Sequence, residues 1–107
     1  MIDRATFNLI KEKHGRYASW AVWTDGIRKP KENVGDLTVF NVGKNVTLLT
    51  DLNPNLVFVG LNISRSIVSP FGNFHDARPS SMDYKIRYAL KNTVLWGAYM
   101  TDITKRL

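Results

Sequence analysis

The chain contains no cysteine, which excludes disulfide bonds, thiolate zinc sites and a cysteine nucleophile. It also lacks any apolar run near the roughly 20 residues that a membrane-spanning helix needs. The first residues, Met1-Ile2-Asp3-Arg4, do not show the basic start and apolar segment of a secretory signal. From these absences we expect a soluble cytoplasmic protein with no membrane partner.

Acidic residues are scarce as well: 9 Asp and Glu face 15 Lys and Arg, so the formal net charge is +6. This excess favours an anionic partner such as nucleic acid, and a basic surface that binds nothing is almost as common an explanation. A length of 107 residues with 44% hydrophobic residues suits one domain with a true core. Because no internal repeat interrupts the sequence, we treat residues 1–107 as a single domain.

Two segments have the apolar periodicity of helices. In residues 3–13, Phe7 and Ile10 are three positions apart, and Gly15 follows as a typical helix stop. In residues 82–92 the apolar positions recur every four residues and would face the core: Met82, Ile86 and Leu90.

Three segments favour strands, namely residues 18–23, 56–59 and 95–100. The second is a continuous apolar run, which is typical of a parallel strand buried on both faces. The order of elements predicts an α/β fold with three layers, in which helices flank a short, mostly parallel sheet. A sheet of so few strands leaves an open edge, so we expect a homo-oligomer that forms through that edge.

The remaining segments have weaker signals. Residues 24–36 and 62–81 have the composition of loops, and residues 51–55 that of a turn. Residues 37–50 stay unassigned between helix and strand.

Polar residues follow two of the predicted strands, where ligands bind in open parallel sheets. Gly60-Leu61-Asn62-Ile63-Ser64 follows the first, and Asp102 lies at the end of the second. If these strands are neighbours, the loop with Phe71-Gly72-Asn73-Phe74-His75-Asp76 shares their crevice. The side chains of this region suit a nucleobase, since phenylalanine stacks on a base, asparagine offers a donor and an acceptor, and Arg65 can meet a phosphate.

Three segments in this order resemble the uracil-DNA glycosylase superfamily, and most closely its mismatch-specific thymine/uracil branch: Val57–Asn62, Gly72–Phe74 and Gly97–Arg106. Members of that branch carry a strand ending in Gly-hydrophobic-Asn-Pro-Gly and a Gly-Asn-Arg-Phe-Trp segment. Their next strand ends in Thr-Asp or Thr-Asn, followed by a hydrophobic residue, another residue and Lys-Arg. The resemblance covers roughly residues 55–106, which implies that this chain corresponds to the first half of such a domain.

The resemblance implies roles for individual residues. Asn62 would position the water that attacks the sugar carbon, Phe71 or Phe74 would stack on the base, and Asn73 would shape the pocket. Asp102, Lys105 and Arg106 would lie beside the pocket as structural or phosphate-facing groups. The full predicted set of base-binding or nucleic-acid-binding residues is Gly60, Leu61, Ser64, Arg65, Phe71, Asn73, Phe74, His75, Asp102 and Lys105. We expect no cofactor and no metal, because the only histidine besides His75 is His14, which lies in the first predicted helix.

The chain also departs from the family pattern. Ile63 and Ser64 stand where the family has proline and glycine, and His75 stands where an aromatic or basic residue is usual. The family domain continues with two further strands and a late loop that wedges into the duplex, which helps to offset the cost of base flipping. We therefore expect a nucleic-acid or nucleobase binding module with little or no glycosylase activity. Two alternatives stay open: a small protein-binding inhibitor or regulator of the phage or mobile-element type, and a glycosylase completed by another chain.

Other aromatic and basic residues have simpler explanations. Trp20, Trp23 and Trp96 suit core positions, and Tyr84 and Tyr88 share one helix face, which favours packing. The basic residues of the 24–36 loop suit a solvated loop better than a contact with nucleic acid.

Overall fold

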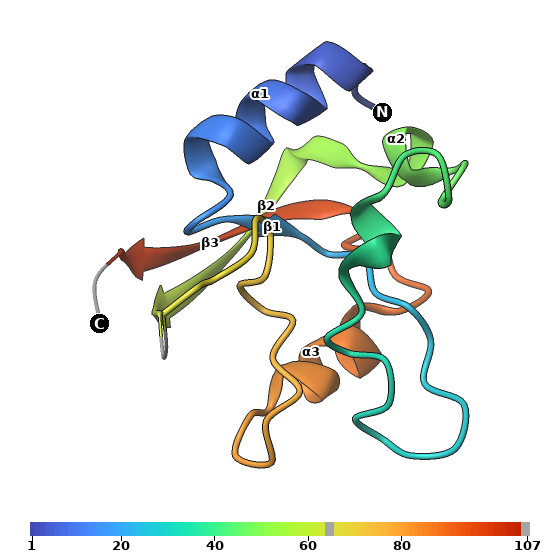
Figure 1. The fold of residues 1–107 in the computed structure, drawn as a ribbon, viewed down its shortest axis with the longest axis vertical. Helices are drawn as coiled ribbons and strands as arrows, with labels where there is room; N and C mark the ends of the chain where they lie inside the picture. The colour runs from blue at the N-terminus through green and yellow to red at the C-terminus, as the bar shows by residue number, and fades with distance from the viewer. Residues whose placement is uncertain (64–65, 106–107) are drawn as a thin grey trace.

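The computed structural model describes residues 1–63 and 66–105, with only the backbone of Asn62. These residues form a small α/β domain around a three-stranded mixed sheet with the order β1-β3-β2 (Figure 1). The strands are β1 (Ser19–Trp20), β2 (Asn53–Asn62) and β3 (Ala98–Thr104). The central strand β3 is parallel to β2 and antiparallel to β1, so the sheet is mixed and not mostly parallel.

The first predicted helix is confirmed as α1 (Arg4–His14). The Asp3 side chain caps it by accepting a hydrogen bond from the Thr6 N–H at 2.7 Å, and this bond lowers the pKa of Asp3. At the other end the Gly15 N–H donates to the Lys11 carbonyl oxygen. Capping residues therefore set both ends of this helix, and the predicted stop at Gly15 is confirmed.

The second predicted helix is confirmed as α3 (Asp83–Leu90). Leu90 is buried and Ile86 packs against the same apolar cluster. Met82 is 56% exposed, because it precedes the helix as its N-cap residue. Its predicted core position is therefore wrong.

The segment left unassigned contains two short helical pieces, a 3-10 helix (Leu37–Phe40) and α2 (Leu48–Asp51). The turn predicted for residues 51–55 is wrong, since α2 ends at Asp51 and β2 begins at Asn53, with only Leu52 between them. The Asn53 N–H donates to the Gly97 carbonyl oxygen at 2.9 Å, which joins the start of β2 to the start of β3. None of the helices in the described part is long and apolar enough to cross a membrane.

The buried side chains form two clusters on opposite faces of the sheet. Phe7 of α1 and Trp20 belong to the first, while Leu90 of α3 and Met100 belong to the second. Adjacent side chains of a strand point to opposite faces, and Tyr99 accordingly packs on the first cluster. The sheet thus separates α1 from α3 (Figure 1).

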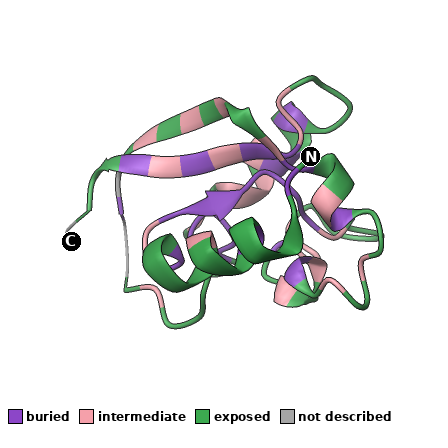
Figure 2. Ribbon diagram, turned by 90° about the horizontal axis from the view of Figure 1, so that it is seen from above, coloured by how far each residue is buried: buried purple, intermediate pink, exposed green. Residues whose placement is uncertain are grey.

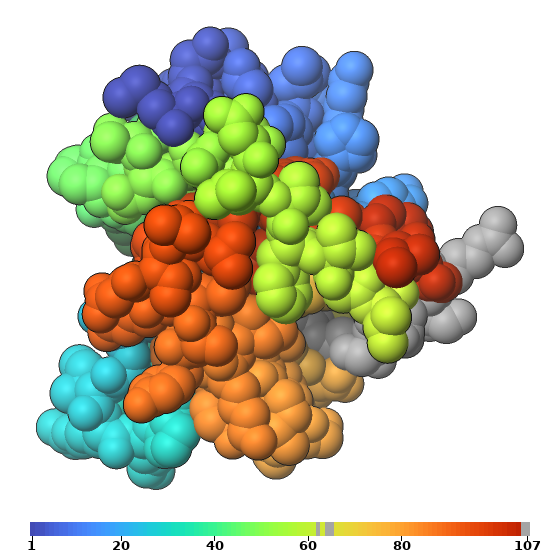
Figure 3. Space-filling view, turned by 180° about the vertical axis from the view of Figure 1, so that it is seen from behind, coloured from blue at the N-terminus to red at the C-terminus, as the bar shows by residue number. Residues whose placement is uncertain are grey.

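Strand β2 differs from its prediction. It is an edge strand, and Val57, Val59 and Leu61 are 52%, 52% and 79% exposed. Phe58 points to the other face and packs on the second cluster, so exposure alternates along the strand (Figure 2). Figure 3 shows β2 lying at the surface beside β3. The prediction of burial on both faces is wrong, because no element among residues 1–63 and 66–105 covers one face of β2.

Candidate functional site at the carboxyl ends of the parallel strands

The carboxyl ends of β2 and β3 lie side by side, as expected for neighbouring parallel strands. Gly60 is in register with Asp102, and Asn62 is in register with Thr104. Asn73 reaches the same place from the long loop, and its Nδ2 donates to Asp102 Oδ2 at 2.8 Å. Residues from all three segments of the family resemblance therefore meet at one point.

Gly60 allows this close approach. A β-carbon at Gly60 would overlap Asp102 Oδ1 and would lie 3.3 Å from Phe74 Cε1. Since only glycine lacks a β-carbon, no other residue leaves room here for the Asp102 carboxylate. That carboxylate belongs to a residue only 3% exposed, so it lies against β2 and away from solvent.

Asn73 joins three parts of the chain through its side-chain amide. Nδ2 donates to the Tyr17 carbonyl oxygen at 2.7 Å as well as to Asp102, and Oδ1 accepts from the Phe74 N–H at 3.1 Å. A side-chain amide has two N–H donors, and both are used. In this arrangement Asn73 holds the site together and presents no free donor to a ligand.

Phe71 and Phe74 flank Asn73, and both are buried. Phe71 packs against Phe7 and Phe40, with ring centroids 5.5 and 5.2 Å apart, while Phe74 meets Phe58 edge-on at 6.0 Å. Their φ angles are 63° and 66°, in the left-handed region that bulky side chains rarely adopt. Such residues cost about 1–3 kcal/mol each and are concentrated at functional sites.

His75 is 3% exposed and stacks on Trp23 with a centroid distance of 5.1 Å. Its Nε2 lies 2.8 Å from the Val22 carbonyl oxygen and its Nδ1 lies 2.9 Å from that of Asn73. Burial lowers the pKa of His75, the charge of Arg87 lowers it further, and the two carbonyl oxygens oppose the shift. His75 is therefore a side chain of the core, bonded to the backbone and turned away from solvent.

The carboxylate of the neighbouring residue, Asp76, forms an ion pair with Arg78. Its Oδ2 accepts from Arg78 Nε at 2.8 Å. Among the described residues, no group of three or more His, Asp or Glu side chains is placed to hold a metal ion.

The exposed part of the site lies beyond the buried cluster. Leu61 is 79% exposed, and the exposed Lys105 donates from Nζ to Thr101 Oγ1 at 2.6 Å. Ser64, Arg65 and Arg106 lie outside the described residues, and only the backbone of Asn62 is described.

Sequence reasoning missed two groups that support the site. The Tyr17 carbonyl oxygen holds Asn73, and the Ser19 hydroxyl donates to the Phe71 carbonyl oxygen at 2.9 Å. Both interactions involve a backbone carbonyl, which has the same chemistry at every position, so no residue pattern could have indicated them.

No family model matches this chain, and comparisons with curated proteins and with solved structures give no match either.

Proposed function

We propose that this protein is a nucleic-acid or nucleobase binding module, derived from a uracil-DNA glycosylase-like fold, with its site at the carboxyl ends of β2 and β3. The observation that supports this proposal is the meeting of Gly60, Asn73, Phe74 and Asp102, which come from three separate segments. Ligands of open α/β sheets bind at this end of parallel strands. The left-handed φ of Phe74 adds a second reason, because strain of this kind is concentrated at functional sites.

In this proposal the buried cluster forms the floor of the site, and the ligand approaches from the solvent side. Asp102 and Asn73 fix each other, so the floor is rigid. The exposed side chains of Leu61 and Lys105 then offer an apolar contact and a positive charge. The net charge of +6 attracts the phosphate backbone over longer distances.

Binding is tested with labelled single-stranded and duplex DNA that contains uracil. We expect binding at low salt whose affinity falls steeply as salt is raised. Lys105→Ala should weaken binding. It should also reduce the slope of log affinity against log salt concentration (the salt slope) by about one unit. Lys44→Ala is the matched control, since Lys44 is also exposed but lies in another part of the chain. Equal effects of the two substitutions would contradict the position of the site.

Catalysis is tested by base release from uracil-containing or mismatched duplexes. We expect little or no release from these 107 residues, and we expect Asn62→Ala to abolish any that is found. Rapid release would instead support a glycosylase, and release that survives Asn62→Ala would contradict the role assigned to Asn62.

A second proposal concerns the open edge of the sheet. β2 pairs only with β3 in the described part of the chain, its exposed face carries Val57, Val59 and Leu61, and it contains no charged residue. We propose that two copies associate through this edge. Because β2 carries no charge, repulsion between two positively charged chains is weakest there.

Size-exclusion chromatography with light scattering tests this association. We expect a dimer that Val59→Lys converts into a monomer, because a charge on an edge strand blocks pairing. A clean monomer of the unchanged chain would contradict the proposal. A monomer that also binds no DNA at low salt would favour the remaining hypothesis, an inhibitor or regulator that binds a protein partner.

A further inference from the structure

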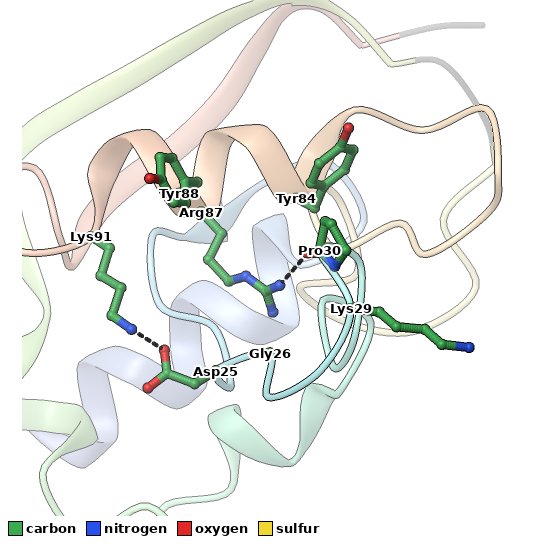
Figure 4. A pocket seen from close by; sticks show the side chains of 8 residues that line it. All are labelled: Asp25, Gly26, Lys29, Pro30, Tyr84, Arg87, Tyr88 and Lys91. Atoms are coloured by element: carbon green, nitrogen blue, oxygen red, sulfur yellow. Dashed lines mark hydrogen bonds and ion pairs between the residues drawn. The ribbon is translucent and has the colours of Figure 1, made fainter.

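A groove lies between α3 and the loop of residues 25–30 (Figure 4). Its cavity of about 360 Å³ is within the range of small-molecule sites, about 300–1,000 Å³. One side is formed by Tyr84, Arg87, Tyr88 and Lys91, which recur with helical spacing along α3 and the residue after it. We call this feature the α3 groove. It shares no residue with the site at the strand ends.

Arg87 contributes a buried positive charge to the groove. The residue is 6% exposed, and its guanidinium donates at 2.7 Å to the carbonyl oxygens of Thr24, Glu32 and Pro30. Within residues 1–63 and 66–105 no carboxylate lies within ion-pair distance of it. Arginine has five N–H donors, so these bonds leave donors for a ligand. The carboxylates of Asp25 and Glu32 act on this charge only from beyond ion-pair distance. A buried cation without a directly paired anion favours a ligand that brings a negative charge.

The face of α3 beside Arg87 is aromatic and basic. Tyr88 is 86% exposed, so its predicted packing role is wrong, and its ring offers a flat surface to solvent. Tyr84, one turn earlier, carries the ammonium of Lys31 over its ring at 5.2 Å. Stacking surfaces with cations beside them are the usual means by which proteins bind unpaired bases.

Lys91 supplies a cation that a ligand can use. Its Nζ pairs with Asp25 Oδ1 at 2.8 Å, but the two side chains are 46% and 63% exposed. An exposed pair of this kind contributes about 0–1 kcal/mol, so a phosphate can replace Asp25 at little cost. Figure 4 shows this pair and the bond from Arg87 to Pro30 on the same side of α3.

We infer that the α3 groove binds a nucleotide, with the phosphate against Arg87 and Lys91 and the base stacked on Tyr88. Arginine suits the phosphate because its planar fork can donate two parallel hydrogen bonds. The phenol ring suits the base because every base has a π-face. Free nucleotides and single-stranded nucleic acid share this chemistry. The inference does not depend on the site at the strand ends.

The experiment uses the full chain and a fluorescently labelled oligothymidylate of ten nucleotides. Binding is followed by fluorescence anisotropy at low salt. We expect Tyr88→Ala to weaken binding about tenfold, as the loss of one stacked base does. Lys91→Ala should weaken it and lower the salt slope by about one unit. Lys85→Ala is the matched control: Lys85 is an exposed lysine of α3 that does not line the groove. We expect its affinity to stay within about twofold of the unchanged chain.

Competition identifies the source of the nucleotide. If uridine monophosphate displaces the oligonucleotide more strongly than ribose 5-phosphate does, the groove accepts a free nucleotide. If neither competes while Tyr88→Ala still weakens binding, the ligand is a strand. Equal competition by the two compounds would overturn the stacking of a base on Tyr88.

Two further results separate this inference from the proposed function. If Tyr88→Ala binds as tightly as Lys85→Ala while Lys105→Ala loses affinity, the groove is overturned and the strand-end site is supported. If only Tyr88→Ala and Lys91→Ala lose affinity, the groove is supported and the strand-end site is overturned. The absence of any binding by the unchanged chain overturns the inference.

Discussion

The strand-end site and the α3 groove each contain a buried charged side chain, but the groups that surround the two charges differ. Asp102 is 3% exposed, and its carboxylate accepts from Asn73 beneath the cover of Gly60 and Phe74. Arg87 is 6% exposed, but its guanidinium lines an open cavity and is bonded only to neutral carbonyl oxygens. The first arrangement is closed by the chain itself, while the second leaves room for an anion.

This difference shows that the burial of a charged residue does not by itself indicate a binding site. What matters is whether the groups that surround the charge already satisfy it. The following substitutions test whether the buried floor of the strand-end site is built for stability and the α3 groove for a ligand, from the largest expected effect to the smallest.

Phe74→Ala should have the largest effect on stability. Phe74 is 7% exposed and lies against Phe58 and Gly60, so its removal leaves a cavity in the closed region. We expect a loss of about 3–5 kcal/mol in the free energy of unfolding, measured with urea. Leu61→Ala, at an exposed position of β2, is the control and should change it by less than about 0.5 kcal/mol. Equal losses would show that the region is not closed.

Arg87→Leu should come next. The substitution removes the donor that three carbonyl oxygens of the 24–32 loop share. A hydrogen bond to a charged donor contributes about 1.5–3 kcal/mol. Leucine removes the cost of burying the charge together with the three bonds, so we expect a net loss of about 3 kcal/mol in the same denaturation experiment. Arg28→Leu is the control, because Arg28 is an exposed arginine of the same loop. A loss below about 1 kcal/mol would mean that Arg87 is held for a ligand alone.

Gly60→Ala tests the close contact between β2 and β3. The new methyl group would overlap Asp102 Oδ1, so the carboxylate must move away from Asn73. Overpacking of this kind costs about 1–3 kcal/mol. Gly43→Ala provides a comparison, because its β-carbon meets only the Asn41 side chain, at 3.3 Å. A neutral Gly60→Ala variant would show that the cluster tolerates rearrangement.

The pH dependence of stability tests the burial of His75. Its pKa is lowered in the folded state, so the unfolded chain binds the proton more readily below about pH 6.5. The contribution of His75 is therefore complete above that pH and is lost as the pH falls, by up to about 1.4 kcal/mol per pH unit. Urea denaturation between about pH 5 and 7 measures this slope, above the range where ordinary carboxylates titrate.

His75→Gln should abolish this slope of unfolding free energy against pH, even if the substitution itself changes the free energy of unfolding. A flat profile of the unchanged chain would mean that the folded protein accepts the proton as readily as the unfolded one.

Tyr88→Ala should have the smallest effect on stability. The side chain is 86% exposed, so we expect a change below about 0.5 kcal/mol in the free energy of unfolding. Thermal melting followed by circular dichroism would detect a larger change. A stable Tyr88→Ala variant that loses oligonucleotide affinity would complete the contrast with Phe74→Ala, since both changes remove an aromatic ring.

Local chemistry made part of the fold predictable. Asp3 and Gly15 mark the ends of α1 because capping depends on neighbouring residues alone. The adjacency of β2 and β3 was only a condition at the level of the sequence, because the order of strands in a sheet depends on contacts between distant segments. Residues 37–50 resisted assignment because their helical pieces are a single turn long, which is too short for periodicity to be visible.

Burial was harder to predict, because it depends on what covers a surface. The apolar run of β2 shows that its residues suit a sheet, but not that one face lacks a neighbour. In the same way, the spacing of Tyr84 and Tyr88 places them on one face of α3 without showing that Tyr88 faces solvent. The role of Arg87 was hidden for a related reason, since its partners are backbone carbonyl oxygens.

The composition of the exposed edge strand also affects how readily the chain aggregates in concentrated solution. Residues 55–62 are uncharged and free of proline, and they are rich in β-branched and aromatic side chains. Segments of this kind form the stacked cross-β spines of amyloid when they are accessible. Most such segments are hidden by folding, whereas this one lies at an open edge in the native structure. An open edge of this composition is an aggregation hazard wherever no second copy covers it, and Val59→Lys would protect it.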